Sequence, residues 1–153
     1  MRNIQFKTVL LSLFTLYFFG SLSAQVTMEK VAEKWTFLID DNPFEVKGAT
    51  FGYDEDVANY EQYFKELKYL GVNTIRTWGT TDHTKKLLDA AAAQDIKVML
   101  GIWMRHGRPG MEADDSFDYL KDTAGKEAMY KNAINIVNQY KEHPAILTWG
   151  VGN

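Results

Sequence analysis

From residue 44 onward the sequence alternates between strand-forming and helix-forming segments, and this order restricts the possible folds more than any other feature. Short runs rich in apolar and β-branched residues occupy 44–52, 72–79, 96–103 and 145–152. Apolar residues recur at helical spacing in the longer segments 59–71, 82–94 and 126–143. Strands that alternate with helices in this way predict an α/β fold, with a parallel sheet covered by helices.

Two architectures share this order of elements: an open doubly wound sheet and a closed (β/α)8 TIM barrel. Four strand–helix units are half of such a barrel, which typically takes about 250 residues. On the barrel interpretation, residues 25–153 are the N-terminal part of a longer, truncated domain. Before the first unit, residues 34–48 contain two extended runs around a turn-rich Asp40–Pro43 cluster, which predicts a short β-hairpin.

The first 24 residues have the composition of a secretory signal peptide. Arg2 and Lys7 precede a charge-free apolar stretch at 8–20, and small residues follow up to Ala24. The apolar stretch is too short to span a membrane comfortably, so an uncleaved anchor is the less favoured alternative. We expect cleavage after Ala24, no stable membrane association afterwards, and a secreted or periplasmic protein.

Charge and cysteine content exclude several classes of function. The net charge is −3 and the basic residues are scattered, whereas a nucleic-acid-binding surface would show a basic patch. The chain contains no cysteine, which excludes disulfides, thiol nucleophiles and cysteine-ligated zinc within it. Its three histidines have no metal-binding spacing, and we expect neither a metal nor a cofactor.

Arg76 and His106 lie where α/β folds place their ligand sites. Arg76 lies near the carboxyl end of the second predicted strand, and its alternation places it on one face with Thr74 and Trp78. An edge position with the guanidinium extended into solvent is the alternative for a lone arginine. His106 follows the third predicted strand and is therefore expected at the same edge of the sheet.

Aromatic residues recur at this level of the sheet. Trp78, Trp103 and Trp149 each fall at or near the carboxyl end of a predicted strand. Each alone could be an ordinary core residue. Together they suit the apolar faces of sugar rings, since C–H groups pack on an aromatic face while hydroxyl groups remain hydrogen-bonded at its edge.

The stretch that follows the last predicted strand admits a second hypothesis. Gly150 and Gly152 form a GxG pattern, which is a weak indication of a dinucleotide-binding loop. That motif needs a third glycine and an acidic residue about 20 positions later. It also normally follows the first strand, whereas here it follows the fourth, so we do not favour this function.

The segment "HPAILTWGVGN" resembles a segment of the retaining glycoside hydrolase clan with (β/α)8 barrels, most of all family 2, which includes β-galactosidases and β-glucuronidases. "FEVKGATFG" is similar to the first barrel strand of those enzymes, and "LKYLGVNTIRTWG" is similar to their second unit. "LGIWMRHGRPG" is more similar to the third strand of the cellulase-type family 5. The resemblance covers roughly residues 35–153.

The resemblance implies roles for individual residues. Arg76 matches the arginine that holds the nucleophile carboxylate, and Asn153 matches the asparagine that bonds the sugar 2-hydroxyl beside the acid/base glutamate. His106 matches a histidine that lies near the sugar in the cellulase-type families. The three tryptophans are expected as further sugar contacts because of their position and ring chemistry. The acid/base glutamate is expected directly after Asn153 and the nucleophile further downstream, so residues 25–153 alone are expected to be inactive.

The implied function is hydrolysis of O-glycosidic bonds in a β-linked glycan, by double displacement through a covalent glycosyl-enzyme and without a cofactor. The expected partner is an oligo- or polysaccharide. A transglycosylase on the same scaffold differs only in whether water or another sugar attacks the intermediate. A non-catalytic carbohydrate-binding protein on a barrel scaffold is the other alternative.

Overall fold

The computed structural model of the protein describes residues 26–108 and 117–152. The expected signal peptide at 1–24 and the expected site residue Asn153 lie outside these residues. In the described parts of the chain, no helix combines the length and the apolar character needed to cross a membrane.

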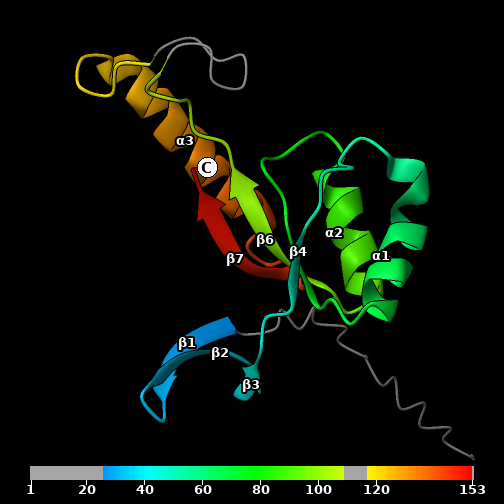
Figure 1. Ribbon diagram of the computed structural model, residues 1–153. Coiled ribbons are helices and arrows are strands. Elements are labelled where there is room, and N and C mark those ends of the chain that lie inside the picture. The colour runs from blue at the N-terminus through cyan, green and yellow to red at the C-terminus, as the bar shows by residue number, and fades with distance from the viewer. Residues whose placement is uncertain (1–25, 109–116, 153) are drawn as a thin grey trace, which may run out of the picture.

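A four-stranded parallel sheet forms the centre of the fold (Figure 1). Its strands follow chain order across the sheet: β4 (Gly48–Thr50), β5 (Thr74–Arg76), β6 (Lys97–Ile102) and β7 (Ile146–Val151). Every neighbouring pair is parallel. Parallel neighbours require a long connection between them, and each of the three connections contains a helix. The predicted α/β order of elements is therefore confirmed.

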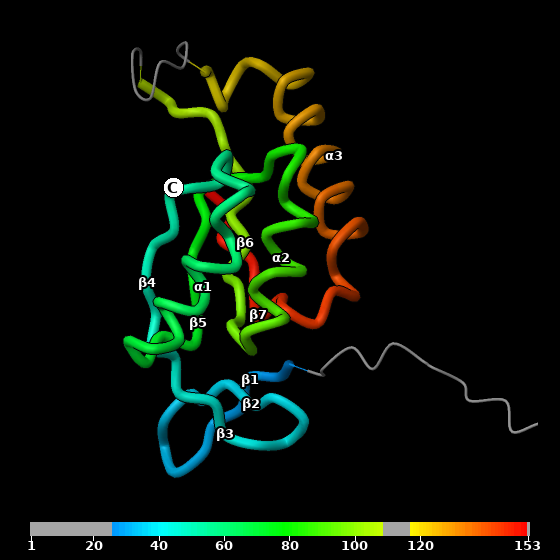
Figure 2. The backbone as a smooth tube through the Cα atoms, turned by 90° about the vertical axis from the view of Figure 1, so that its right-hand side faces the viewer, coloured from blue at the N-terminus to red at the C-terminus, as the bar shows by residue number. Residues whose placement is uncertain are grey.

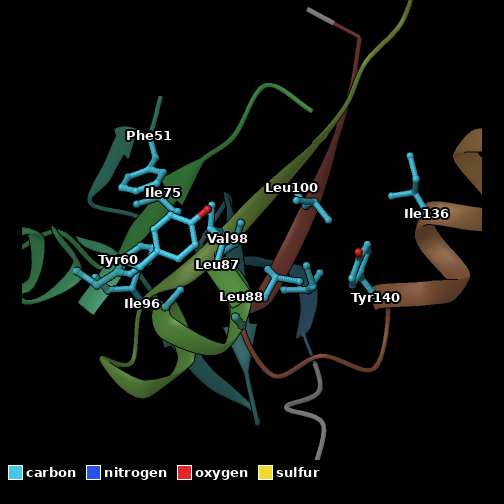
Figure 3. Packing of buried hydrophobic residues seen from close by; sticks show 14 of the residues in the cluster. Phe51, Tyr60, Ile75, Leu87, Leu88, Ile96, Val98, Leu100, Ile136 and Tyr140 are labelled. Carbon is cyan, nitrogen blue, oxygen red and sulfur yellow. The ribbon is translucent and has the colours of Figure 1, made fainter. Parts of the chain in front are cut away.

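The helices are α1 (Tyr60–Tyr69), preceded by the short 3-10 helix η1 (Val57–Asn59), α2 (Thr84–Ala93) and α3 (Thr123–Tyr140). All three contribute to one buried apolar cluster with the sheet, and Figure 3 shows side chains from each of them in it. The cluster includes Tyr60 and Phe64 of α1, Leu87, Leu88 and Ala91 of α2, and Ile136 and Tyr140 of α3. The three helices therefore cover the same face of the sheet.

The two faces of the sheet are chemically distinct. On β6, Val98, Leu100 and Ile102 belong to the cluster beneath the helices and are at most 1% exposed. Met99 and Gly101 alternate with them and face the opposite side, which we call the inner face. Gly150 of β7 lies on the inner face too, since a Cβ there would be 3.7 Å from Met99 Cγ. In a closed (β/α)8 barrel, this helix-free face becomes the interior.

A separate three-stranded antiparallel sheet precedes the parallel one. It consists of β1 (Val26–Val31), β2 (Lys34–Ile39) and β3 (Asn42–Phe44), in that order. Figures 1 and 2 show it beyond the amino ends of the parallel strands, away from the edge where ligand sites form. The predicted hairpin corresponds to β2 and β3. β1 is an additional strand that the sequence pattern did not reveal.

The first predicted strand, 44–52, is wrong in its extent. Phe44 pairs with Phe37 in the antiparallel sheet, and only Gly48–Thr50 joins the parallel sheet. The bend between them is held by Asn73, whose amide donates to the Glu45 carbonyl at 2.8 Å and whose side-chain oxygen accepts from the Lys47 N–H at 2.8 Å. A run of strand-forming residues thus serves two different sheets.

We predict that Gly101→Ala destabilises the protein strongly. A Cβ at position 101 would lie 2.5 Å from the Thr77 carbonyl oxygen and 2.5 Å from the Trp78 carbonyl carbon, and these backbone atoms cannot move without opening the sheet. Overpacking of this kind costs about 1–3 kcal/mol of unfolding free energy. Denaturant unfolding measures the loss. Gly107→Ala is the matched control, since nothing lies within 4 Å of a Cβ there. Equal stability of the two variants would contradict the close approach.

Candidate functional site

The carboxyl ends of the four parallel strands form one continuous edge. Backbone hydrogen bonds extend the sheet beyond the strands themselves: the Phe51 N–H donates to the Arg76 carbonyl at 2.9 Å, and the Gly152 N–H donates to the Ile102 carbonyl at 3.1 Å. The residues that follow the strands are therefore held at one level. This is the edge where α/β folds bind their ligands.

Arg76 and Trp78 interact directly at this edge. The Arg76 guanidinium carbon lies 4.5 Å from the centroid of the Trp78 ring, which is within the range of a cation–π interaction. Ile75 and Thr77, which alternate with them, are buried. The predicted shared face of Arg76 and Trp78 is thus observed. β5 lies between β4 and β6, so the alternative of an edge-strand arginine is wrong.

The end of β5 is locked against the end of β6. The Gly101 N–H donates to the Thr77 hydroxyl oxygen at 3.0 Å, and that hydroxyl donates to the Gly79 carbonyl oxygen at 3.3 Å. Thr77 is only 2% exposed, so both hydrogen bonds are shielded from water. A Cβ on Gly79 would lie 3.6 Å from Trp103 Cβ. These contacts place the Trp78 segment beside Trp103.

Trp103 and His106 form a second pair, on the segment after β6. Their ring centroids are 5.1 Å apart and their planes are at 88°, an edge-to-face arrangement. Both side chains are half-buried. Trp103 continues the alternation of Met99 and Gly101 and so leaves the strand on the inner face. The structure thus brings Trp103 and His106 to the same edge as Arg76.

Trp149 lies differently from the other two tryptophans. It is in register with Leu100 on β6, and it is half-buried against the apolar cluster beneath the helices. The register of β7 shifts between Val98 and Met99, so that Thr148 and Gly150 take the inner face. Trp149 lies at the expected level of the sheet but on the helix side. Trp149 and Arg76 therefore lie on opposite faces of the sheet in the described residues. The sugar contact of Trp149 stays a prediction.

Asp54 is a residue of this edge that the sequence pattern did not single out. It follows β4 in the segment 51–56, and its backbone carbonyl accepts a hydrogen bond from the Tyr60 hydroxyl. Its Oδ1 atom is buried and has no hydrogen-bond partner among the described residues. Burial, and secondly the negative charge of Glu55, raise the pKa of the Asp54 carboxyl.

Asp56, two residues further on, is in the opposite electrostatic situation. Its carboxylate accepts hydrogen bonds from the Tyr63 hydroxyl at 2.6 Å and from the Asn59 amide at 3.0 Å. These bonds lower the pKa of Asp56, and the bond from Tyr63 contributes more than the bond from Asn59.

Among the described residues, no group of three or more histidine, aspartate or glutamate side chains could hold a metal ion.

The structure is similar to parts of solved glycoside hydrolases. An exo-chitosanase from Amycolatopsis orientalis, in complex with PNP-β-D-glucosamine, matches over 84% of this chain and 16% of its own, with 17% identity and a TM-score of 0.60. A hyperthermostable endocellulase matches 84% of this chain and 43% of its own, with 13% identity and a TM-score of 0.54. Gas2p of Saccharomyces cerevisiae, in complex with laminaritetraose and laminaripentaose, matches 83% and 28%, with 16% identity and a TM-score of 0.52.

No protein-family model matches the sequence, and no curated protein matches it. The chain spans less than half the length of each of these three structures. At these identities the likeness establishes the fold. The chain has the β/α arrangement of glycoside hydrolase TIM barrels, which confirms the predicted fold class and decides against the open doubly wound sheet.

We predict opposite pH responses for Asp54→Asn and Asp56→Asn. A raised native pKa means that ionising Asp54 costs stability as pH rises through that pKa, so Asp54→Asn should gain stability relative to the parent as pH increases from about 3 to about 7. A lowered native pKa means that ionised Asp56 stabilises the fold, so Asp56→Asn should lose stability over the same range. Thermal unfolding at several pH values measures both, and trends of the same sign would contradict the assignment.

Proposed function

We propose that residues 25–153 belong to a secreted retaining glycoside hydrolase that cleaves a β-linked glycan. The observation that carries this proposal is the pairing of Arg76 with Trp78 on the inner face, at the carboxyl edge of a sheet with the fold of glycoside hydrolase barrels. The similar structures hold a β-D-glucosamine derivative and laminari-oligosaccharides, which supports a β-linked sugar as the substrate class. Family 2, with family 5 as the next closest, remains the family we propose from the sequence resemblance.

Retaining hydrolysis requires two carboxyl groups about 5–5.5 Å apart, one as acid/base and one as nucleophile. By the sequence resemblance, the acid/base would follow Asn153 and the nucleophile would come from a later strand of the barrel. The described residues supply the surroundings of these groups. On this proposal residues 25–153 alone do not catalyse the reaction.

Arg76 is suited to hold the nucleophile carboxylate. The Arg76 guanidinium lies over the Trp78 ring, and its N–H donors lie in the plane of the group. A carboxylate approaching in that plane can accept two parallel hydrogen bonds. The contact with Trp78 also restricts the position of the guanidinium before substrate binds. Arg76 would thereby keep the nucleophile ionised and correctly oriented.

The segment 1–24 would direct export and be removed, which gives a secreted or periplasmic protein. The proposed chemistry needs no cofactor, because the sugar and two carboxyl groups supply all reacting atoms. Asn153 would bond the sugar 2-hydroxyl, and Trp78, Trp103 and His106 would contact the sugar ring. A transglycosylase would use the same residues, with a second sugar in place of water.

We predict that Arg76→Lys, in the protein carrying the complete barrel, lowers kcat on a β-linked aryl glycoside by about 100-fold or more. An ammonium group cannot reproduce the planar fork or its stacking on Trp78. Arg108→Lys is the control, since Arg108 is exposed. Unchanged turnover in Arg76→Lys would remove Arg76 from the site. Proton NMR of the first-formed product tests retention of configuration, and an inverted product would contradict the retaining mechanism.

A carbohydrate-binding protein without catalysis is the second candidate, and the Trp103–His106 pair beside Trp78 favours it equally. Turnover separates the two candidates. An enzyme releases the aryl group from a β-linked aryl glycoside, whereas a binding protein gives a calorimetric binding signal with β-linked oligosaccharides and no release. Longer oligosaccharide products would instead identify a transglycosylase.

A further inference from the structure

The connection between β6 and α3 carries a set of aromatic residues that the proposed reaction does not use. The Phe117 ring is buried, and the Arg105 guanidinium carbon lies 5.1 Å from its centroid. The Phe117 N–H donates to the His106 carbonyl at 3.3 Å. Residues 105–106 and residue 117 are therefore held against each other, although they are more than ten positions apart in the sequence.

Phe117 is fixed from its other side by the start of α3. A Cβ at position 125 would lie 2.5 Å from Phe117 Cε2, so this close packing requires Gly125. The Gly125 N–H donates to the Asp122 carboxylate at 2.8 Å, which caps the helix. The first turn of the helix thus forms a rigid support beneath the Phe117 ring.

Tyr119 lies beside Phe117 and remains partly exposed. The two rings are in an edge-to-face arrangement, with centroids 4.6 Å apart and planes at 77°, and the Tyr119 hydroxyl donates to the Arg105 carbonyl. The residue is nevertheless 42% exposed. A core role explains Phe117, but it does not explain a partly exposed ring whose hydroxyl is fixed.

We propose that Tyr119, with Arg105, forms a second sugar subsite, which binds a further residue of a β-linked gluco-oligosaccharide. This inference rests on the proposed function and adds an outer subsite to the candidate site. Figures 1 and 2 show that the described residues directly after β6 lie beyond its carboxyl end, and the Trp103–His106 pair joins them to the candidate site.

The chemistry of the residues fits a sugar ring. A partly exposed tyrosine ring can pack against the axial C–H groups of a glucose-type ring, and the neighbouring Arg105 side chain carries N–H groups suited to its hydroxyls. The Tyr119 ring is fixed by Phe117 and by the Arg105 carbonyl before any ligand arrives. Little side-chain entropy is therefore lost on binding.

Calorimetric titration of the protein carrying the complete barrel with laminaripentaose and with cellopentaose tests the subsite. We expect Tyr119→Ala to weaken binding of the preferred pentasaccharide by about tenfold, and to change KM for a β-linked aryl monoglycoside by less than about twofold. Tyr119→Phe keeps the ring face and should retain most of the affinity. Tyr69→Ala is the matched control, since Tyr69 is 91% exposed at the end of α1.

Two results would overturn the inference: equal pentasaccharide affinity of Tyr119→Ala and the parent, or no binding of either pentasaccharide by the parent. A variant-dependent loss of affinity supports the inference whether or not the protein turns over. Binding through Tyr119 without hydrolysis would refute the proposed function alone. Hydrolysis of the aryl monoglycoside with unchanged affinity in Tyr119→Ala would refute the subsite alone.

Discussion

The candidate site depends on one close contact between two strands, where Gly101 of β6 meets the backbone of Thr77 and Trp78. A side chain at position 101 would separate the strands, because the nearest atoms are carbonyl groups at 2.5 Å. The Thr77 hydroxyl then accepts from the Gly101 N–H in a place that water does not reach. A buried hydrogen bond of this kind resists separation of the strands, since either group left without a partner would be costly.

This contact determines which side chains become neighbours at the carboxyl edge. It brings the chain after β5, which carries Trp78, against the chain after β6, which carries Trp103. The Arg76 guanidinium lies over the Trp78 ring, and His106 packs against Trp103. The helices contribute by burying the alternate residues, Ile75 on β5 and Leu100 on β6. Alternation therefore leaves the functional candidates on the face that the helices do not cover.

The order of elements and the helix faces were predictable from the sequence because both depend on local periodicity. α3 illustrates this, since apolar residues that recur at helical spacing in it are all at least half-buried: Met129, Ala133, Ile136, Val137 and Tyr140. Trp149 lies at the predicted level of the sheet, but on its helix side. Its face depends on the register shift between β6 and β7, which is a property of the pairing and has no signature in β7 alone.

Asp54 and Tyr119 were not predictable for a related reason. An aspartate in a loop is ordinarily solvated, and the unusual environment of Asp54 arises from burial beside Tyr60 and from Glu55. Tyr119 is fixed by Arg105, which precedes it by 14 residues, and by Phe117, whose position needs Gly125. Contacts of this kind join residues at the two ends of a loop. Loops have no periodic sequence pattern from which such contacts could be predicted.

The candidate site on the sheet and the proposed subsite at Tyr119 therefore have different physical origins. Arg76 and Trp78 are positioned by the sheet, so their geometry follows from strand register and from the packing beneath them. Tyr119 is positioned by a helix cap and by hydrogen bonds within one connection. On the proposal for Tyr119, substitutions of Arg105, Phe117 or Tyr119 alter the outer sugar contact while β5 and β6 keep their register. This separation is the physical basis on which a barrel can keep one reaction centre and change the oligosaccharide that it accepts.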